Sequence, residues 1–75
     1  MDIKEKIGER ITLLRKEKKK MSQQKFAYEA DIERSFLTHI EKGRKNILVG
    51  TLERILVALN VSFKEFFDSK EFSKP

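Results

Sequence analysis

Apolar residues recur every three or four positions along most of the chain, which is the period of an amphipathic helix. No stretch of the sequence alternates apolar and polar residues in the manner of a strand. The pattern predicts an all-α fold, a compact five-helix bundle, with helices over about 3–19, 23–30, 33–42, 48–59 and 63–68. Residues 1–68 are expected to form one domain, and residues 69–75 a short tail that frays.

Local signals support these ranges. Ser22 and Ser62 each precede a helix, where a hydroxyl can accept a hydrogen bond from an otherwise unpaired backbone N–H. Gly43 follows the third helix, where a left-handed residue is expected. Gly8 lies inside the first helix and costs about 1 kcal/mol relative to alanine, so close packing of another helix is expected there.

One face of each expected helix is apolar and should point into the core. The first four helices contribute Ile3, Ile7, Ile11, Leu14, Phe26, Ala27, Ala30, Leu37, Ile40, Leu48, Leu52, Ile55, Leu56 and Leu59.

The second and third helices, between Ser22 and Gly43, are short and separated by a tight turn at Asp31-Ile32. Leu37 and Ile40 would hold the back of the third helix, which leaves its polar face free. A rigid helix with polar side chains at its start, on a basic protein, is suited to reading a DNA major groove.

Charge favours the same kind of partner. The 75 residues carry a net charge of +5, with lysines and arginines gathered around 16–25 and 42–45. Each such cation near a phosphate can release a condensed counterion. A merely soluble basic domain is the alternative.

Composition excludes several other classes. The chain has no cysteine and one histidine, so no disulfide, metal site or cofactor is expected. No apolar run approaches the roughly 20 residues of a membrane span, and the amino terminus lacks a secretory signal. We therefore expect a cytoplasmic protein without enzymatic activity.

The ordered segments between about Ile7 and Phe67 resemble the Xre/Cro-type helix-turn-helix domain of phage repressors and small bacterial regulators. The matching segments are Ile7-Gly-Glu-Arg-Ile11, Ser22-Gln-Gln-Lys-Phe-Ala27, Arg34-Ser-Phe-Leu37, Ile40-Glu-Lys-Gly43, Asn46, Thr51-Leu52-Glu-Arg-Ile55, Ala58-Leu-Asn-Val-Ser-Phe63 and Phe66-Phe67. Arg34-Ser-Phe-Leu with Ile40-Glu-Lys-Gly-x-x-Asn also looks like restriction–modification controller proteins. The resemblance implies a lambda-repressor-like fold that binds operator-like DNA, usually as a two-fold dimer.

Two positions depart from the family pattern. The loop at Lys18-Lys19-Lys20 is one residue longer than usual and lacks the common glycine, so its turn should differ. Ile47 stands where the family often has proline, so the fourth helix should start less sharply.

The resemblance implies that the third helix is the recognition helix, which contacts the bases. Its expected base contacts are Glu33, Arg34, Ser35, Thr38 and His39. Arg34 can donate two hydrogen bonds to guanine O6 and N7, and the methyl of Thr38 can meet a thymine methyl. Glu33 can accept from cytosine N4, or instead orient Arg34 or cap the helix. His39 can contact guanine or phosphate, or make no contact.

Phosphate contacts are expected from residues on and around the recognition helix: Gln23, Phe36, Arg44, Lys45 and Asn46. In the family, the Gln23 position anchors a phosphate and braces the third helix; an ordinary exposed glutamine is the alternative. Phe36 can lie against the DNA backbone or pack on its own domain. A solvated loop is the alternative for residues 44–46. Arg15 with Glu41 resembles the family's structural ion pair.

Apolar residues near the end of the domain, Val61, Phe63, Phe66 and Phe67, are expected either in the core or at a dimer interface. Three phenylalanines on one short helix favour the interface. The leading hypothesis is therefore a homodimeric regulator that binds double-stranded DNA. The alternative is a module that uses the fifth helix to bind a toxin or another protein.

Overall fold

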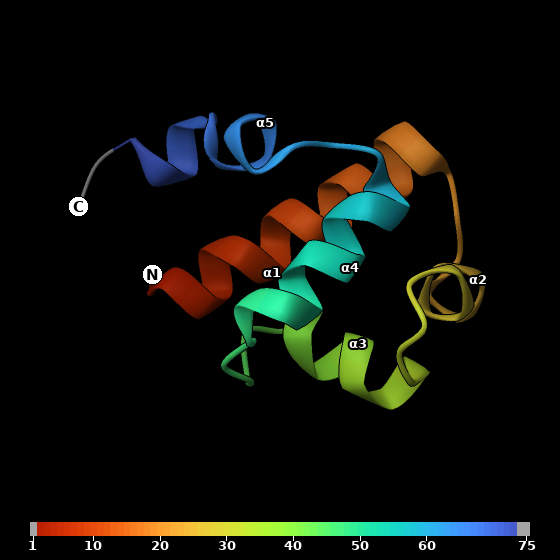
Figure 1. Ribbon diagram of the computed structural model, residues 1–75. Coiled ribbons are helices and arrows are strands. Elements are labelled where there is room, and N and C mark those ends of the chain that lie inside the picture. The colour runs from red at the N-terminus through yellow and green to blue at the C-terminus, as the bar shows by residue number, and fades with distance from the viewer. Residues whose placement is uncertain (1, 74–75) are drawn as a thin grey trace.

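The computed structural model describes residues 2–73, and all regular elements in that range are helices (Figure 1). The elements are α1 (Ile3–Leu14), a π-helical turn (Arg15–Lys19), α2 (Gln23–Glu29), α3 (Arg34–Glu41), α4 (Val49–Leu59), α5 (Phe63–Phe67) and a 3-10 turn (Lys70–Phe72). The all-α, five-helix fold expected from the sequence is confirmed. In Figure 1, α3 and α5 lie on opposite sides of α1.

Every one of the five helices contributes to a single core. The fully buried large side chains are Ile11, Phe26, Leu37, Ile40, Ile55, Leu56, Leu59 and Phe66. Each such side chain contributes about 1.5–3 kcal/mol relative to an exposed position. The core lies between the helices and anchors the inner side of α3 through Leu37 and Ile40.

Gly8 is the point where α1 and α3 press together. A Cβ atom at Gly8 would collide with the carbonyl oxygen of Ile40 and lie 2.7 Å from that of Glu41. The close helix packing expected at Gly8 is confirmed. It fixes the carboxyl-terminal end of α3 against α1.

The link from α1 to α2 has an unusual shape. The last five residues of the first helix, Arg15–Lys19, are wound as a π-helix, and Lys20 follows with φ of 54°. A π-helical turn takes up an extra residue within a continuous helix. Lys20 thus adopts the left-handed conformation that glycine usually supplies.

Two residues expected in the core are exposed. Ile3, the first residue of α1, is 55% exposed at the edge of the helix packing. Leu48 is 78% exposed because it precedes α4 as the N-cap, with ψ of 147°, and therefore does not share the helical stripe of Leu52, Ile55 and Leu59.

Phe66 of α5 is completely buried and stacks edge-on against Phe67, with ring centroids 4.9 Å apart. Phe72 closes this cluster, 4.8 Å from Phe67. Arg10 ties α5 to α1, because its Nε donates to the Phe66 carbonyl oxygen at 3.0 Å. Phe72, in the tail expected to fray, thus packs on α5; the last two residues of the tail, 74–75, lie outside the described range.

Serine and aspartate caps start three of the helices. Ser22 accepts from the Lys25 N–H at 3.2 Å, as expected. Ser62 forms a reciprocal pair with Glu65, whose carboxylate accepts from the Ser62 N–H at 3.0 Å. That backbone hydrogen bond, followed by the one with the Ser62 side chain, lowers the pKa of Glu65. Within the described chain, none of the helices has the length and apolar character needed to cross a bilayer.

Candidate nucleic-acid interface

The turn between α2 and α3 is tight and held by backbone hydrogen bonds. The Ile32 N–H donates to the Ala27 carbonyl oxygen at 3.0 Å, and Asp31 takes the left-handed conformation, with φ of 58°. Ile32 is half-buried against the core. The two helices are therefore fixed relative to each other without any ligand.

The outward side of α3 begins with two exposed polar side chains, Arg34 and Ser35, while His39 is half-buried. Leu37 and Ile40 lie on the opposite side, at 0% and 2% exposure. Glu33 is the exposed N-cap residue, and its carboxylate makes no capping hydrogen bond. The capping role considered for Glu33 is thus wrong, and its carboxylate is left at the surface beside Arg34.

A buried ion pair joins α1 to α3. Arg15 Nε and Nη2 donate to the two carboxylate oxygens of Glu41 at 2.7 and 3.0 Å. The two side chains are only 7% and 5% exposed. Arg15 Nη1 also donates to the Met21 carbonyl oxygen at 2.8 Å, so the pair holds the start of α2 as well.

Gln23 extends this ion pair toward the outward side of α3. Its Nε2 donates to Glu41 Oε1 at 2.9 Å, and its Oε1 accepts from Thr38 Oγ1 at 3.1 Å. The expected bracing of α3 by Gln23 is present. The reading of Gln23 as an ordinary exposed glutamine is wrong, because it is half-buried and bonded to two neighbours.

Two residues expected at the DNA surface are partly withdrawn from it. The Thr38 hydroxyl points to Gln23 Oε1 and to the Arg34 carbonyl oxygen, at 3.1 and 3.0 Å. Phe36 is half-buried and packs against the core, which is the second of the two alternatives considered for it. Aromatic burial explains this placement.

Residues 44–46 follow α3 in an exposed loop. The chain enters it through Gly43, with φ of 73°, and the Arg44 N–H donates to the His39 carbonyl oxygen at 2.9 Å. Arg44, Lys45 and Asn46 are all exposed. The structure thus places two cations and an amide directly beyond the end of α3.

One of the lysines in the link between α1 and α2 has a structural role. Lys18, one of the cations gathered around 16–25, is exposed, and its Nζ donates to the Asn60 carbonyl oxygen at 2.7 Å. Asn60 ends α4, where a cation is favourable beside the free carbonyl groups. Lys16 and Lys20 remain exposed.

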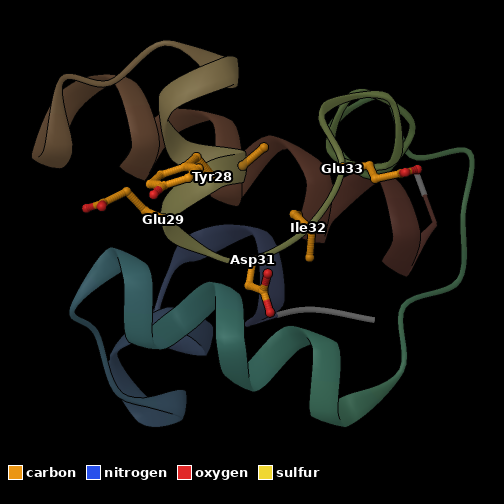
Figure 2. Close-up of a pocket in the computed structure, with 6 residues that line it drawn as sticks. Tyr28, Glu29, Asp31, Ile32 and Glu33 are labelled. Carbon is orange, nitrogen blue, oxygen red and sulfur yellow. The ribbon is translucent and has the colours of Figure 1, made fainter.

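A wide, acidic hollow lies along α2 and the turn (Figure 2). It is lined by Ala27, Tyr28, Glu29, Asp31, Ile32 and Glu33. Figure 2 shows the Glu29, Asp31 and Glu33 side chains spread along this surface, and Tyr28 is 83% exposed. Three carboxylates disfavour a phosphate backbone, so Glu29 and Asp31 bound the candidate interface, and Glu33 lies where the hollow meets the start of α3.

The apolar residues expected at a dimer interface do not form one exposed cluster. Phe66 is fully buried, so its assignment to an interface is wrong: five helices suffice to enclose it. Val61 and Phe67 are half-buried against the core, and Phe63 is 41% exposed.

Sequence reasoning missed the most exposed apolar residues near α4. Leu48 is 78% exposed, and Val49 and Val57 are each 74% exposed. A signal existed for Val57, which falls outside the helical stripe made by Leu52, Ile55, Leu56 and Leu59, but not for Val49, which is seven residues before Leu56 and falls at the edge of that stripe.

The helix-turn-helix domain model matches residues 8–71. The control protein C.MunI of a Mycoplasma species is 37% identical over 70 residues, which are 93% of this chain and 95% of that protein. The control protein C.BamHI of Bacillus amyloliquefaciens is 36% identical over 81% of this chain and 75% of its own.

A solved structure agrees with these relatives. The restriction–modification controller protein C.Esp1396I, determined as a tetramer in complex with its natural 35-base-pair operator, superimposes with a TM-score of 0.87. It is 30% identical, and the match covers 99% of both chains. The chain therefore belongs to the helix-turn-helix family, and restriction–modification control proteins are among its relatives.

Proposed function

We propose that this protein is a sequence-specific, DNA-binding transcription regulator that places α3 in the major groove of an operator half-site. The observation that carries the proposal is the fixed, outward position of Arg34 and Ser35 on a helix whose back is buried. Binding, not catalysis, is the proposed activity. A regulator of this kind works where the DNA is, which for a bacterial-type regulator is the cytoplasm.

The base contacts proposed are those of Arg34, Ser35, His39 and Glu33. Arg34 donates in a bidentate manner to guanine, a contact worth about 1–3 kcal/mol of discrimination. Ser35 and His39 add single hydrogen bonds farther along the same surface. Glu33 accepts from a cytosine amino group or steadies Arg34, because capping is excluded by its geometry.

The phosphate contacts proposed flank α3 on both sides. Gln23 keeps one Nε2 hydrogen that has no partner among residues 2–73, and this hydrogen is available to a phosphate. Arg44, Lys45 and Asn46 bind the backbone beyond the other end of α3. Such contacts set register and carry no sequence code.

A homodimer is the proposed binding unit, with its interface on α4 and Phe63. Gly50 and Val57 are two helical turns apart on the exposed side of α4, with Glu53 and Arg54 between them. A Cβ atom at Gly50 would meet no atom of residues 2–73 within 4 Å, so no contact in this part of the subunit accounts for a glycine there. Close approach of a second α4 accounts for it, and the carboxylate and guanidinium can pair across a two-fold axis.

Sedimentation velocity tests the interface. Val57→Asp puts a charge on the proposed contact and is expected to convert the dimer to a monomer. Tyr28→Asp makes the same change of charge at another exposed position and is expected to remain a dimer. A Val57→Asp variant that sediments like the wild type would remove α4 from the interface.

A gel-shift titration on the duplex upstream of the protein's own gene tests the binding function. Retardation is expected at low salt, weakening steeply as salt rises because each phosphate contact releases counterions. Binding that is absent, or insensitive to salt, would contradict the proposal. The alternative of a toxin-binding module on α5 is not favoured, since Phe66 is buried and the relatives described above are control proteins.

A further inference from the structure

Thr38 lies between the residue proposed to bind a phosphate and the residue proposed to read a base. Its hydroxyl is 3.1 Å from Gln23 Oε1 and 3.0 Å from the Arg34 carbonyl oxygen. We infer that Thr38 is a positioning residue, which sets where Arg34 lies relative to Gln23, and that it is not a base contact. The inference rests on the proposed reading of DNA by α3.

The charges in this network fix the direction of each hydrogen bond. Glu41 is held by Arg15 as a carboxylate and can only accept. The Gln23 amide must therefore turn its NH₂ group to Glu41, since the reversed amide would bring two oxygens to 2.9 Å. Its carbonyl oxygen then faces Thr38, whose single hydroxyl proton is shared between this oxygen and the Arg34 carbonyl oxygen.

The network thus runs from α1 to the first turn of α3. Thr38 is one helical turn beyond Arg34, and its hydroxyl proton, shared between Gln23 Oε1 and the Arg34 carbonyl oxygen, couples α2 to the backbone from which Arg34 projects. A bidentate contact to guanine requires both guanidinium N–H groups to be aligned with O6 and N7. Without the Thr38 donor, Gln23 Oε1 faces a methyl group and α2 is no longer tied to this turn.

Two substitutions at Thr38 separate positioning from contact. Thr38→Val keeps the shape and removes the hydroxyl, while Thr38→Ser keeps the hydroxyl and removes the methyl. Thr12→Val is the matched control, because the Thr12 hydroxyl makes the same kind of bond within its own helix, to the Gly8 carbonyl oxygen at 2.9 Å, and makes no hydrogen bond to Gln23, Thr38 or Arg34 among residues 2–73. Binding is measured on the preferred duplex and on duplexes altered one base pair at a time.

The result is evaluated at the base pair for which the wild-type protein has a preference that Arg34→Ala loses. Thr38→Val is expected to lose about tenfold in discrimination at that pair, while Thr38→Ser and Thr12→Val keep it. The affinity of the Thr38 and Thr12 variants for unrelated DNA should not change. Gln23→Leu, which removes the acceptor, is expected to lose discrimination at the same pair, and it provides a second test should Thr38→Val fold poorly.

Other patterns overturn the inference. If Thr38→Ser loses preference and Thr38→Val keeps it, the methyl is a base contact. If Thr38→Val loses preference at a different pair from Arg34→Ala, the hydroxyl is a base contact. A wild-type protein with no preferred duplex would instead overturn the proposed function itself.

Discussion

The guanidinium of Arg15 holds both carboxylate oxygens of Glu41, at 2.7 and 3.0 Å, and neither side chain is more than 7% exposed. This pair fixes α3 against α1. Such a pair is strongly coupled to folding, because the loss of either partner leaves a buried charge without compensation.

Arg15→Met should therefore lower the free energy of unfolding by about 3–5 kcal/mol, measured by urea denaturation. Lys4→Met removes the cation of the exposed Lys4–Asp2 pair, 3.5 Å apart, and should change stability little. Equal stability of the two variants would show that the Arg15–Glu41 pair does not support the fold.

Gly8 and Gly50 both lie within helices, and replacing each by alanine is expected to have opposite effects on stability. Gly8→Ala should destabilise the protein, because the new Cβ would collide with the carbonyl oxygens of Ile40 and Glu41 and push α3 away from α1. Gly50→Ala should raise the stability of the subunit by about 0.5–1 kcal/mol, since open space surrounds that position. Thermal unfolding at a concentration that keeps the protein monomeric measures both. A stabilising Gly8→Ala would contradict the packing described here.

Lys20 is a long side chain in a left-handed backbone conformation, with φ of 54°. Lys20→Gly removes that strain and should raise the melting temperature by a few degrees, after allowance for the greater freedom of glycine in the unfolded chain. Asn60→Gly, at a φ of 59°, should gain less, because asparagine tolerates this conformation. A lower melting temperature for Lys20→Gly would indicate that the lysine side chain stabilises the turn.

The Ser62 backbone N–H, bonded to Glu65, holds the pKa of that carboxyl below its ordinary value of 4.5. The folded state therefore releases the Glu65 proton more readily than the unfolded state does. The resulting stability is present above pH 4.5 and is lost as the pH falls through the lower pKa of the folded state.

Glu65→Gln should accordingly reduce the fall in melting temperature between about pH 6 and pH 3. Glu53→Gln removes an exposed carboxylate of α4 outside any cap and controls for the change in charge. If Glu65→Gln shows the same acid sensitivity as the wild type, the cap does not contribute to it.

The sequence predicted the elements well wherever apolar periodicity and local capping agreed. Leu52, Ile55 and Leu59 fall on one helical stripe and are buried, and Ser22 caps α2 as its position before the helix indicates. The prediction that Leu48 is buried was wrong, because the apolar spacing continues across the N-cap, where the backbone is no longer helical. Periodicity alone does not show where a helix begins.

The sequence predicted which residues of the site face outward better than it predicted the hydrogen bonds between them. The outward place of Arg34 and Ser35 follows from the inward Leu37 and Ile40. The inward turn of the Thr38 hydroxyl does not, because it depends on Gln23, fifteen residues away in the chain. Phe66 was likewise misplaced, since only the assembled bundle shows that there is room to enclose it.

Selection of bound sites from random duplex DNA tests whether α3 reads DNA. We expect a palindromic motif with half-sites about 34 Å apart, one DNA turn, and loss of preference at one symmetric base pair in Arg34→Ala. Lys45→Ala should weaken binding to all sequences alike and reduce the salt slope by about 1. Recovery of no motif, or a motif unchanged by Arg34→Ala, would contradict the assignment of α3 as the helix that reads DNA.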